Sequence, residues 1–205
     1  MENEKDVIFA LDAETTSLWG KAFAIGVALT NLKGNIIKTW VGRCPAEDKV
    51  DPWVEENVLP QMEGIPVTHK CYKDLLAGFV EFYMENKDNA HIVVHMGLPV
   101  EARLFLDAHQ LGFIGDWDAP FPLIDASAFP KIGTSVDNYN AGNGVVVDAN
   151  MFTGGTHNPL YDSYATALAY LHITDGGGIK DVRRNKEEII YLSGTKKDLG
   201  RLLDH

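Results

Sequence analysis

Residues 7–19 read Val-Ile-Phe-Ala-Leu-Asp-Ala-Glu-Thr-Thr-Ser-Leu-Trp, and this stretch decides the fold. Its first five residues form an apolar run that ends at a carboxylate, which is typical of a buried strand. Asp12 and Glu14 are two positions apart, so both side chains project from the same face of an extended chain. Two carboxylates on one face repel each other unless a cation lies between them. Taken alone, the pair is better explained as a polar strand end that reaches solvent.

Outward from this stretch, two more apolar runs predict an antiparallel meander. They cover residues 23–29 and 36–41, and short turns separate the three runs. Asp51 and Pro52 then predict the N-cap and first turn of a short helix that reaches residue 58 or 59. A longer helix is expected over residues 72–85, because apolar side chains return there at helical spacing: Leu75, Leu76, Phe79, Phe82 and Tyr83.

The second half of the chain alternates predicted strands and helices. In chain order we expect a strand at 92–94, a helix at 100–111 ended by Gly112, a strand at 122–126 and a helix at 160–173. The inward residues of the first of these helices are predicted to be Ala102, Phe105, Leu106 and Ala108. Residues 131–150 are rich in Gly, Asn and Asp, and they predict a long surface loop. Three meander strands followed by strand–helix–strand–helix predict an α/β sandwich with carboxylates at its strand ends.

The composition fits one domain with a strongly acidic balance. Of 205 residues 45% are hydrophobic, and 18 Lys and Arg against 29 Asp and Glu give a formal charge of −11. A chain of this length buries roughly 70% of the surface that its unfolded form exposes, which is enough for one core. A duplex binder that wraps phosphates in Lys and Arg should be basic. The acidity excludes that class, so the protein either avoids nucleic acid or touches little of it and holds phosphate through metal ions.

Three features of the sequence bear on the compartment. No apolar stretch approaches the roughly 18 residues of a membrane-spanning helix, so no membrane partner is expected. Residues 1–6 are acidic, unlike a signal or transit peptide. Cys44 and Cys71 fit neither a disulfide framework nor a metal knuckle, so a cytoplasmic location is expected.

Residues 155–165 carry a second pair of groups with catalytic chemistry. His157 precedes Asp162 by five positions at the entrance to the last predicted helix. An alternative of equal weight is that His157 or Asn158 caps this helix and Asp162 interacts with its dipole.

Residues 95–106 carry a third candidate. A strand runs out into a Gly/Pro loop and enters a helix with Glu101 in its first turn. The alternative is again a contact with the helix dipole, with Arg103 as a surface partner. Asp107 is a poorer candidate for a site carboxylate, because it lies one and a half turns later and faces another direction.

In this order, the three segments resemble the DEDDh 3′–5′ exonucleases, the superfamily of ribonuclease T, oligoribonuclease and the proofreading subunit of bacterial DNA polymerase III. The resemblance covers residues 6–174. Asp12-Ala-Glu14-Thr15 is similar to the first family motif, Asp-x-Glu-Thr, and residues 157–162 are similar to the third, His-x4-Asp, including the Asn after the His. The middle motif departs from the family, because Glu101 stands where an Asp is usual.

The resemblance implies a fold, a reaction and a set of site residues. The expected fold is ribonuclease H-like: a central mixed sheet, with the antiparallel meander plus parallel strands, flanked by helices. Asp12, Glu14, Glu101 and Asp162 would bind two divalent cations, Mg²⁺ or Mn²⁺, roughly 3.5–4 Å apart around the scissile phosphate. His157 would be the general base. The products would be nucleoside 5′-monophosphates, with residues 1–174 as the exonuclease domain and 175–205 as a Gly-led tail.

The resemblance also implies a substrate and substrate contacts. The expected partners are 3′ ends of single-stranded RNA or DNA, and several relatives are dimers, so a homodimer is expected as well. Leu18 falls where the family has an apolar residue against the terminal bases, and Trp19 lies beside it. Thr15 would offer its N–H and hydroxyl to the terminal 3′-OH. Phe23 is better explained by core packing.

Two other classes of protein are weighed against this one. Asp12 to Ser17 is superficially similar to the Asp-x-Gly-Thr-Thr-Ser of sugar kinases and actin-like ATPases. Glu14 would add bulk and charge where their glycine lets the backbone approach phosphate, and such kinases need two domains. The other rival is an inactive exonuclease-like fold that binds nucleic acid or protein. The unusual middle motif favours it, whereas the four other charged site residues oppose it.

Overall fold

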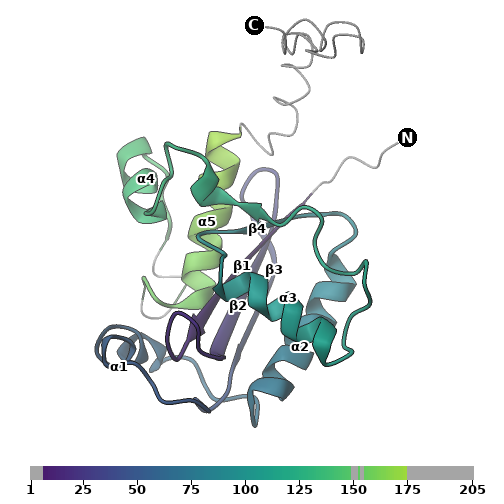
Figure 1. Ribbon diagram of the computed structural model, residues 1–205. Helices are drawn as coiled ribbons and strands as arrows, with labels where there is room; N and C mark the ends of the chain where they lie inside the picture. The colour runs from purple at the N-terminus through teal and green to yellow at the C-terminus, as the bar shows by residue number, and fades with distance from the viewer. Residues whose placement is uncertain (1–6, 149–151, 153–154, 175–205) are drawn as a thin grey trace, which may run out of the picture.

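The computed structural model describes residues 7–148, 152 and 155–174 (Figure 1). In chain order its elements are β1 (Val7–Thr15), β2 (Ala22–Asn31), β3 (Ile36–Arg43), α1 (Pro52–Asn57), η1 (Leu59–Met62), α2 (Tyr72–Asn86), β4 (Ala90–Val94), α3 (Val100–Gln110), β5 (Ile124–Asp125), η2 (Ala126–Ala128), α4 (Val136–Asn143) and α5 (Pro159–Ile173). The tail at 175–205, with its glycines, lies outside the described residues.

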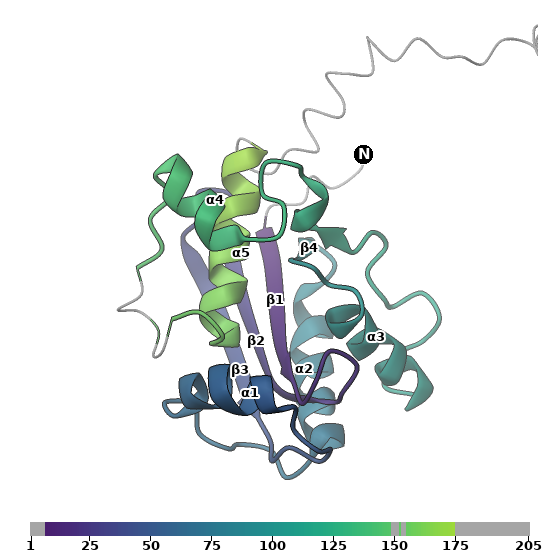
Figure 2. The ribbon, with the colours of Figure 1, turned by 60° about the vertical axis from the view of Figure 1, so that its left-hand side comes forward.

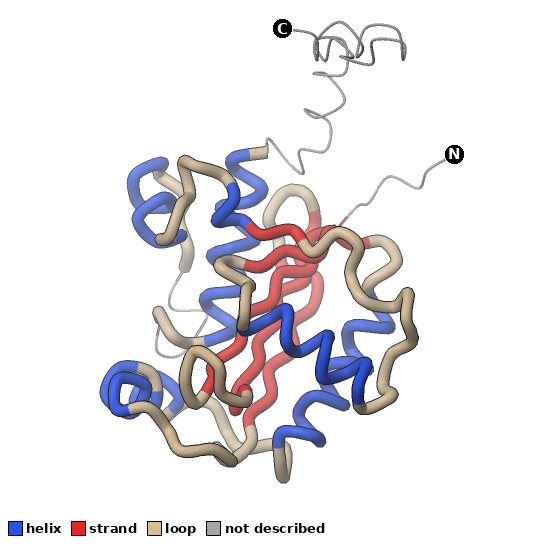
Figure 3. Tube along the Cα trace, viewed as in Figure 1, coloured by secondary structure: helices blue, strands red, loops and turns tan. Residues whose placement is uncertain are grey.

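One five-stranded mixed sheet organises these elements, in the order β3-β2-β1-β4-β5 (Figure 3). β1 pairs antiparallel with β2, and β2 antiparallel with β3. β4 pairs parallel with β1, and β5 parallel with β4. The predicted meander and the mixed sheet are therefore confirmed. The carboxyl ends of β1 and β4 meet at the same edge of the sheet, so the residues that follow them gather there.

The side chains of β1 alternate between two hydrophobic cores. Phe9 and Leu11 belong to a core shared with α1, α2 and α3, whereas Ile8 and Ala10 belong to a core shared with α4 and α5. Figures 1 and 2 show α4 and α5 on one side of the sheet and α2 on the other. Because side chains alternate along a strand, Asp12 and Glu14 continue the Ile8 row and face the α5 side.

Gly26 of β2 allows α5 to approach the sheet at the level of Asp12. Gly26 is the β2 partner of Asp12, and a Cβ added to it would overlap the backbone of Pro159, the first residue of α5. Asn158 caps the helix, because its side-chain oxygen accepts hydrogen bonds from the N–H groups of Leu160 and Tyr161, at 3.0 and 3.4 Å. The close contact at Gly26 thus brings the first turn of α5 beside the end of β1.

The predicted helices at the start of the chain are also found. Asp51 caps α1, since its carboxylate accepts the N–H of Trp53 at 2.9 Å. α2 covers the predicted residues and buries the predicted apolar positions, with Phe82 half-buried. Cys44 and Cys71 are free thiols. No helix among the described residues is long and apolar enough to cross a membrane.

Three details of the second half differ from the prediction. Residues 131–150 are not one long loop, because they contain α4, which Ser135 caps through a hydrogen bond to the N–H of Asn138. The strand expected at 122–126 is reduced to β5 and is followed by η2. Leu106 does not face inward but is 55% exposed, since the buried stripe of α3 runs through Glu101, Leu104, Phe105 and Ala108 at helical spacing.

Candidate active site

Asp12 and Glu14 lie at the end of β1, below the first turn of α5. Burial raises the pKa of the Asp12 carboxyl and the pKa of the Glu14 carboxyl well above their usual ranges. Neighbouring acids raise these pKa values further: Glu101 acts on Asp12, and Asp12, Asp162 and Glu101 act on Glu14. Asp12 and Glu14 are each only partly exposed and lie beside Glu101 and Asp162, so they belong to a cluster of acids and are not an isolated polar strand end.

Glu101 lies in the first turn of α3, and its carboxylate binds the backbone of β1 where a neighbouring strand would otherwise pair. β4 pairs with β1 only as far as Ala10, so it does not reach Ala13. The N–H of Ala13 donates instead to Oε1 of Glu101, at 3.0 Å. Glu101 is 3% exposed, and burial raises its pKa to about 8. Asp107, the other candidate, lies elsewhere, as it accepts the hydroxyl of Tyr72 at 2.7 Å.

Asp162 lies in the first turn of α5, and His157 lies in the loop just before this helix. The carboxylate of Asp162 accepts the backbone N–H of His157 at 2.8 Å, so the acid fixes the loop that carries the imidazole. Burial and the nearby Asp12 raise the pKa of Asp162 to about 9. His157 has a φ of 67°, a left-handed conformation that is uncommon outside glycine, and the bond to Asp162 stabilises this turn.

The imidazole of His157 lies between an acid and an indole. Its Nδ1 is 3.9 Å from Oε1 of Glu14, and the ring of Trp53 in α1 meets it edge-on at 5.5 Å between centroids. Burial lowers the pKa of His157, an effect that the nearby carboxylate of Asp137 opposes. The ring is therefore held close to the carboxylates by contacts from two different elements.

The donor set of the site fits a hard divalent cation. One ligand atom each from Glu14, His157 and Asp162 lie within 4.8 Å of one another. Asp12 and Glu101 are close enough to raise the pKa of Glu14, so four carboxyls share the end of β1. Carboxylate oxygens are the ligands that Mg²⁺ and Mn²⁺ prefer, and a cation would remove the repulsion that raises these pKa values.

A cleft of about 300 Å³ opens over these groups. Asp12, Glu14, His157 and Asp162 line it, together with residues at the start of α4 and after β4. His95 also lines the cleft, and its Nε2 is 3.0 Å from the carbonyl oxygen of Gly133. The imidazole of His95 is thus hydrogen-bonded and partly buried.

Asp137 is a cleft residue that the sequence did not reveal. It lies in the first turn of α4, where it accepts the hydroxyls of Thr156 at 2.9 Å and Tyr161 at 3.4 Å. These two donors flank His157 on either side in the sequence. A serine N-cap followed by an acid in the next turn is the signal that could have identified α4, but the Gly- and Asn-rich composition concealed it.

Asp125 shapes the loop that leads to Glu101. Its carboxylate accepts the N–H groups of Met96 and Gly97, each at 3.0 Å, and also both donors of Ser127. Asp125 is thus occupied in holding the turn between β4 and α3. From the sequence, a strand-end acid here could be a spare carboxylate near the cleft, but Asp125 is not among the residues that line it.

Of the predicted substrate residues, Thr15 ends β1, and Leu18 and Trp19 lie on the loop that follows. Leu18 and Trp19 are 63% and 68% exposed, whereas Phe23 is 1% exposed and packs in the core, as expected. The hydroxyl of Thr15 donates to the carbonyl oxygen of Ser17 at 2.7 Å, which tightens the turn into this loop.

Comparison with known proteins identifies the class of fold. No family model and no curated protein matches the sequence. Solved structures do match, and they show the predicted exonuclease-type, ribonuclease H-like fold. These structures are exonuclease I. The apo form has a TM-score of 0.60 at 13% identity, over 92% of this chain and 47% of the other. The product-bound form has a TM-score of 0.58 at 12% identity, over 84% and 44%. The chain thus spans less than half the length of these exonucleases.

Proposed function

We propose that the protein is a metal-dependent 3′–5′ exonuclease that releases nucleoside 5′-monophosphates from single-stranded RNA or DNA. The observation that carries this proposal is the meeting of three carboxyls and one imidazole, those of Asp12, Glu14, Asp162 and His157, in a cleft at the end of β1, with the buried Glu101 beside them. The fold supports it, because its solved neighbours are exonucleases.

Asp12, Glu14, Glu101 and Asp162 would hold two cations, Mg²⁺ or Mn²⁺. When bound, such ions supply positive charge to the scissile phosphate and lower the pKa of an attacking water. An all-carboxylate set suits these ions and not zinc, for which Cys and His are the usual ligands. Glu101, in the first turn of α3, would reach its ion through one more methylene than an Asp.

His157 would take the proton from the attacking water. An imidazole has an ordinary pKa near 6.5, which suits a base that works near neutral pH. Glu14, 3.9 Å away, would stabilise the imidazolium that results. The bond from His157 N–H to Asp162 would keep the ring over the cleft during this transfer.

The loop after β1 would bind the 3′ end of the strand. Leu18 and Trp19 offer apolar surface to the terminal bases, and stacking on such side chains contributes about 1–3 kcal/mol per base without regard to sequence. Thr15 would offer its backbone N–H and its hydroxyl to the terminal 3′-OH. The net negative charge of the chain is compatible with binding a nucleic acid 3′ end, because only a few nucleotides are bound and metal ions provide positive charge.

The test is digestion of 5′-labelled single-stranded RNA and DNA with Mg²⁺, with Mn²⁺ and with EDTA. We expect a metal-dependent ladder that shortens from the 3′ end, and the better substrate identifies the preferred sugar. Asp12→Ala should abolish the ladder and serves as the control for contaminating nucleases. His157→Ala should lose most turnover while still binding metal. A folded wild-type protein that leaves both substrates intact would contradict the proposal and favour a binding module.

A further inference from the structure

Asp137 connects α4 to both ends of the segment that carries His157. The hydroxyl of Thr156, one residue before His157, donates to Oδ2 of Asp137 at 2.9 Å. The hydroxyl of Tyr161, four residues after His157, donates to Oδ1 of the same carboxylate at 3.4 Å. One side chain of α4 thus accepts a hydrogen bond from each end of the segment 156–161, and the turn that carries the imidazole lies between the two bonds.

The turn at His157 depends on contacts from outside itself. Its φ of 67° is a left-handed conformation, which costs free energy in any residue other than glycine and persists only where the surroundings hold it. The N–H of His157 donates to Asp162, which fixes the backbone from α5. The hydroxyl bonds to Asp137 fix the same turn from α4, so two helices hold it.

α4 is itself attached to α5, so that Asp137 has a fixed base. The side-chain amide of Asn140, which is 2% exposed, donates to the carbonyl oxygen of Ala165 at 3.1 Å. The hydroxyl of Tyr139 lies 2.8 Å from Nδ1 of His172, and Tyr139 is buried in the core that the two helices share. Figures 1 and 2 show α4 and α5 side by side.

Asp137 lies beside the imidazole but apart from the candidate cation ligands. Asp137, Thr156 and His157 all line the cleft. Burial lowers the pKa of His157, and the charge of Asp137 opposes this effect, so the carboxylate is near the ring. Among the residues that the structure describes, the group whose ligand atoms could meet on one ion is Glu14, His157 and Asp162, without Asp137. The contacts of Asp137 therefore concern the placement of His157.

We propose that Asp137 is a positioning residue for His157, the general base of the proposed exonuclease on which this inference rests. Through the hydroxyls of Thr156 and Tyr161, its carboxylate would keep the turn in one conformation and the imidazole over the attacking water. A misplacement of about 1 Å in a reacting group can cost about 100-fold in rate, so an anchor outside the reacting groups affects turnover. Because Asp137 would act on the proton transfer and not on substrate binding, its loss should lower kcat and leave KM unchanged.

Steady-state kinetics on a single-stranded decamer, of the sugar type that the wild type cleaves, test this role. We expect Asp137→Ala and Thr156→Val each to lower kcat about 10-fold at an unchanged KM. The double variant should be no slower than Asp137→Ala, because both substitutions remove the same hydrogen bond. Asp137→Asn keeps an oxygen that can accept the Thr156 hydroxyl, so its kcat should stay within about 3-fold of the wild-type value.

Amide hydrogen exchange of His157, followed by NMR in EDTA, tests the same contacts without turnover. Exchange of the His157 N–H should be about 10-fold faster in Asp137→Ala, because the turn opens more often once a hydrogen bond to a charged group is lost. Tyr161→Phe should also speed this exchange, since it removes the second hydroxyl bond to Asp137.

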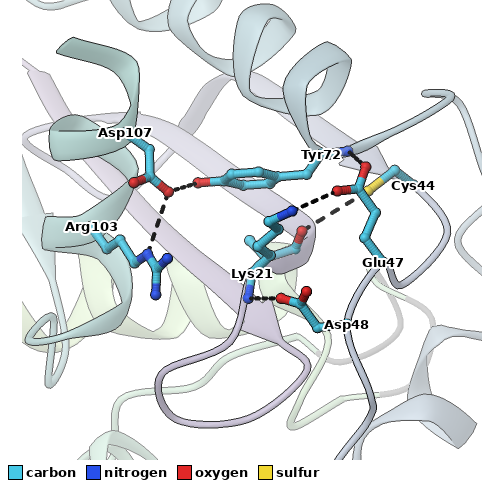
Figure 4. Close-up of polar contacts among 8 residues, drawn as sticks. Lys21, Cys44, Glu47, Asp48, Tyr72, Arg103 and Asp107 are labelled. Carbon is cyan, nitrogen blue, oxygen red and sulfur yellow. Dashed lines mark hydrogen bonds and ion pairs between the residues drawn. The ribbon is translucent and has the colours of Figure 1, made fainter. Parts of the chain in front are cut away.

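Tyr72→Phe is the matched control for Tyr161→Phe. The hydroxyl of Tyr72 likewise donates to the carboxylate of a helix, that of Asp107, at 2.7 Å (Figure 4). Neither Tyr72 nor Asp107 lines the cleft. Both variants therefore lose the same kind of bond, but Tyr72→Phe should leave kcat and the exchange of His157 at their wild-type values.

The outcomes separate this role from the proposed function. Asp137→Ala with the wild-type kcat overturns the proposal, and so does unchanged exchange of His157. A lower KM at unchanged kcat would instead make Asp137 a charge that repels substrate. Asp137→Asn as slow as Asp137→Ala overturns positioning in favour of a purely electrostatic effect. If the wild type leaves the decamer intact, the exonuclease proposal fails, and exchange alone decides: faster exchange in Asp137→Ala supports the anchoring of His157, and equal exchange refutes it.

Discussion

At the scale of single residues, the buried carboxylates of the site repel one another when they are ionised. Glu101 and Asp162 have pKa values raised to about 8 and about 9 by burial and by neighbouring acids. In an unfolded chain the same groups titrate near 4. A carboxyl whose pKa is raised by folding stabilises the fold only while it is protonated. This contribution is complete below about pH 4 and is lost as the pH rises through the folded-state values.

Removing one of these charges should therefore stabilise the metal-free protein. Asp12→Asn keeps the shape of the side chain and removes a charge that raises the pKa of both Glu14 and Asp162. In EDTA at pH 8, we expect its free energy of unfolding to exceed the wild-type value by on the order of 1 kcal/mol. The advantage should shrink as the pH falls to 5, where the acids of the wild type are protonated.

Thermal denaturation at both pH values, with EDTA and with Mn²⁺, measures this difference. Mn²⁺ should raise the melting temperature of the wild type more than that of Asp12→Asn, because the variant has lost a ligand. A variant that melts below the wild type in EDTA at pH 8 would show that the acids do not repel one another in the fold.

At the scale of elements, the site depends on how closely α5 approaches the sheet. Asp162 belongs to α5 and His157 to the loop just before it, whereas Asp12 and Glu14 belong to β1, and the contact at Gly26 brings the start of α5 close to the sheet. α3 adds Glu101 through the N–H of Ala13, and Asp125 at the end of β5 holds the turn before it. The positions of these acids therefore depend on backbone contacts elsewhere: α5 is placed by the contact at Gly26, and the turn before α3 is held by Asp125.

Gly26→Ala should consequently damage the site without touching any of its side chains. The new methyl group would overlap the Pro159 backbone, which cannot rotate away, so α5 must move outward. We expect a loss of stability of about 1–3 kcal/mol, typical of overpacking, together with weaker Mn²⁺ binding.

Gly142→Ala provides the matched control for this substitution. Gly142 lies in α4, and no atom is within 4 Å of the position that its Cβ would take. Because alanine is the better helix former by about 1 kcal/mol, this variant should be as stable as the wild type or more stable. Unfolding curves and Mn²⁺ titrations of the two variants check the prediction. Normal Mn²⁺ affinity in Gly26→Ala would mean that α5 is not placed by this contact.

At the scale of the whole molecule, the sheet was more predictable from sequence than its surroundings. Apolar runs bounded by turns mark β1, β2 and β3 because strand burial leaves a direct pattern in the sequence. α4 left no such pattern, since its buried residues are few and half of its eight residues are Gly or Asn. Leu106 was assigned inward because it is apolar, whereas helical spacing from Glu101 selects Leu104.

The candidate site divides in the same way. Asp12, Glu14, Glu101, His157 and Asp162 could be named from motif order, and the structure brings them together. Asp137 and Asp125 could not, because their roles consist of contacts with Thr156, Tyr161, Met96 and Gly97 that only the tertiary fold creates. Residue type predicts which groups do chemistry, whereas the groups that position them depend on the path of the backbone.

The charge of the whole molecule leads to a prediction about salt. A chain of net charge −11 that holds a single strand through stacking and through metal ions should neutralise only one or two phosphates with its own Lys and Arg side chains. For single strands the logarithm of affinity falls with that of salt by about 0.7 per phosphate, so raising NaCl from 50 to 200 mM should weaken decamer binding only about 3- to 7-fold. Fluorescence anisotropy at fixed Mg²⁺ measures this slope. A loss of a thousandfold would require about seven such contacts and would contradict this account of the binding.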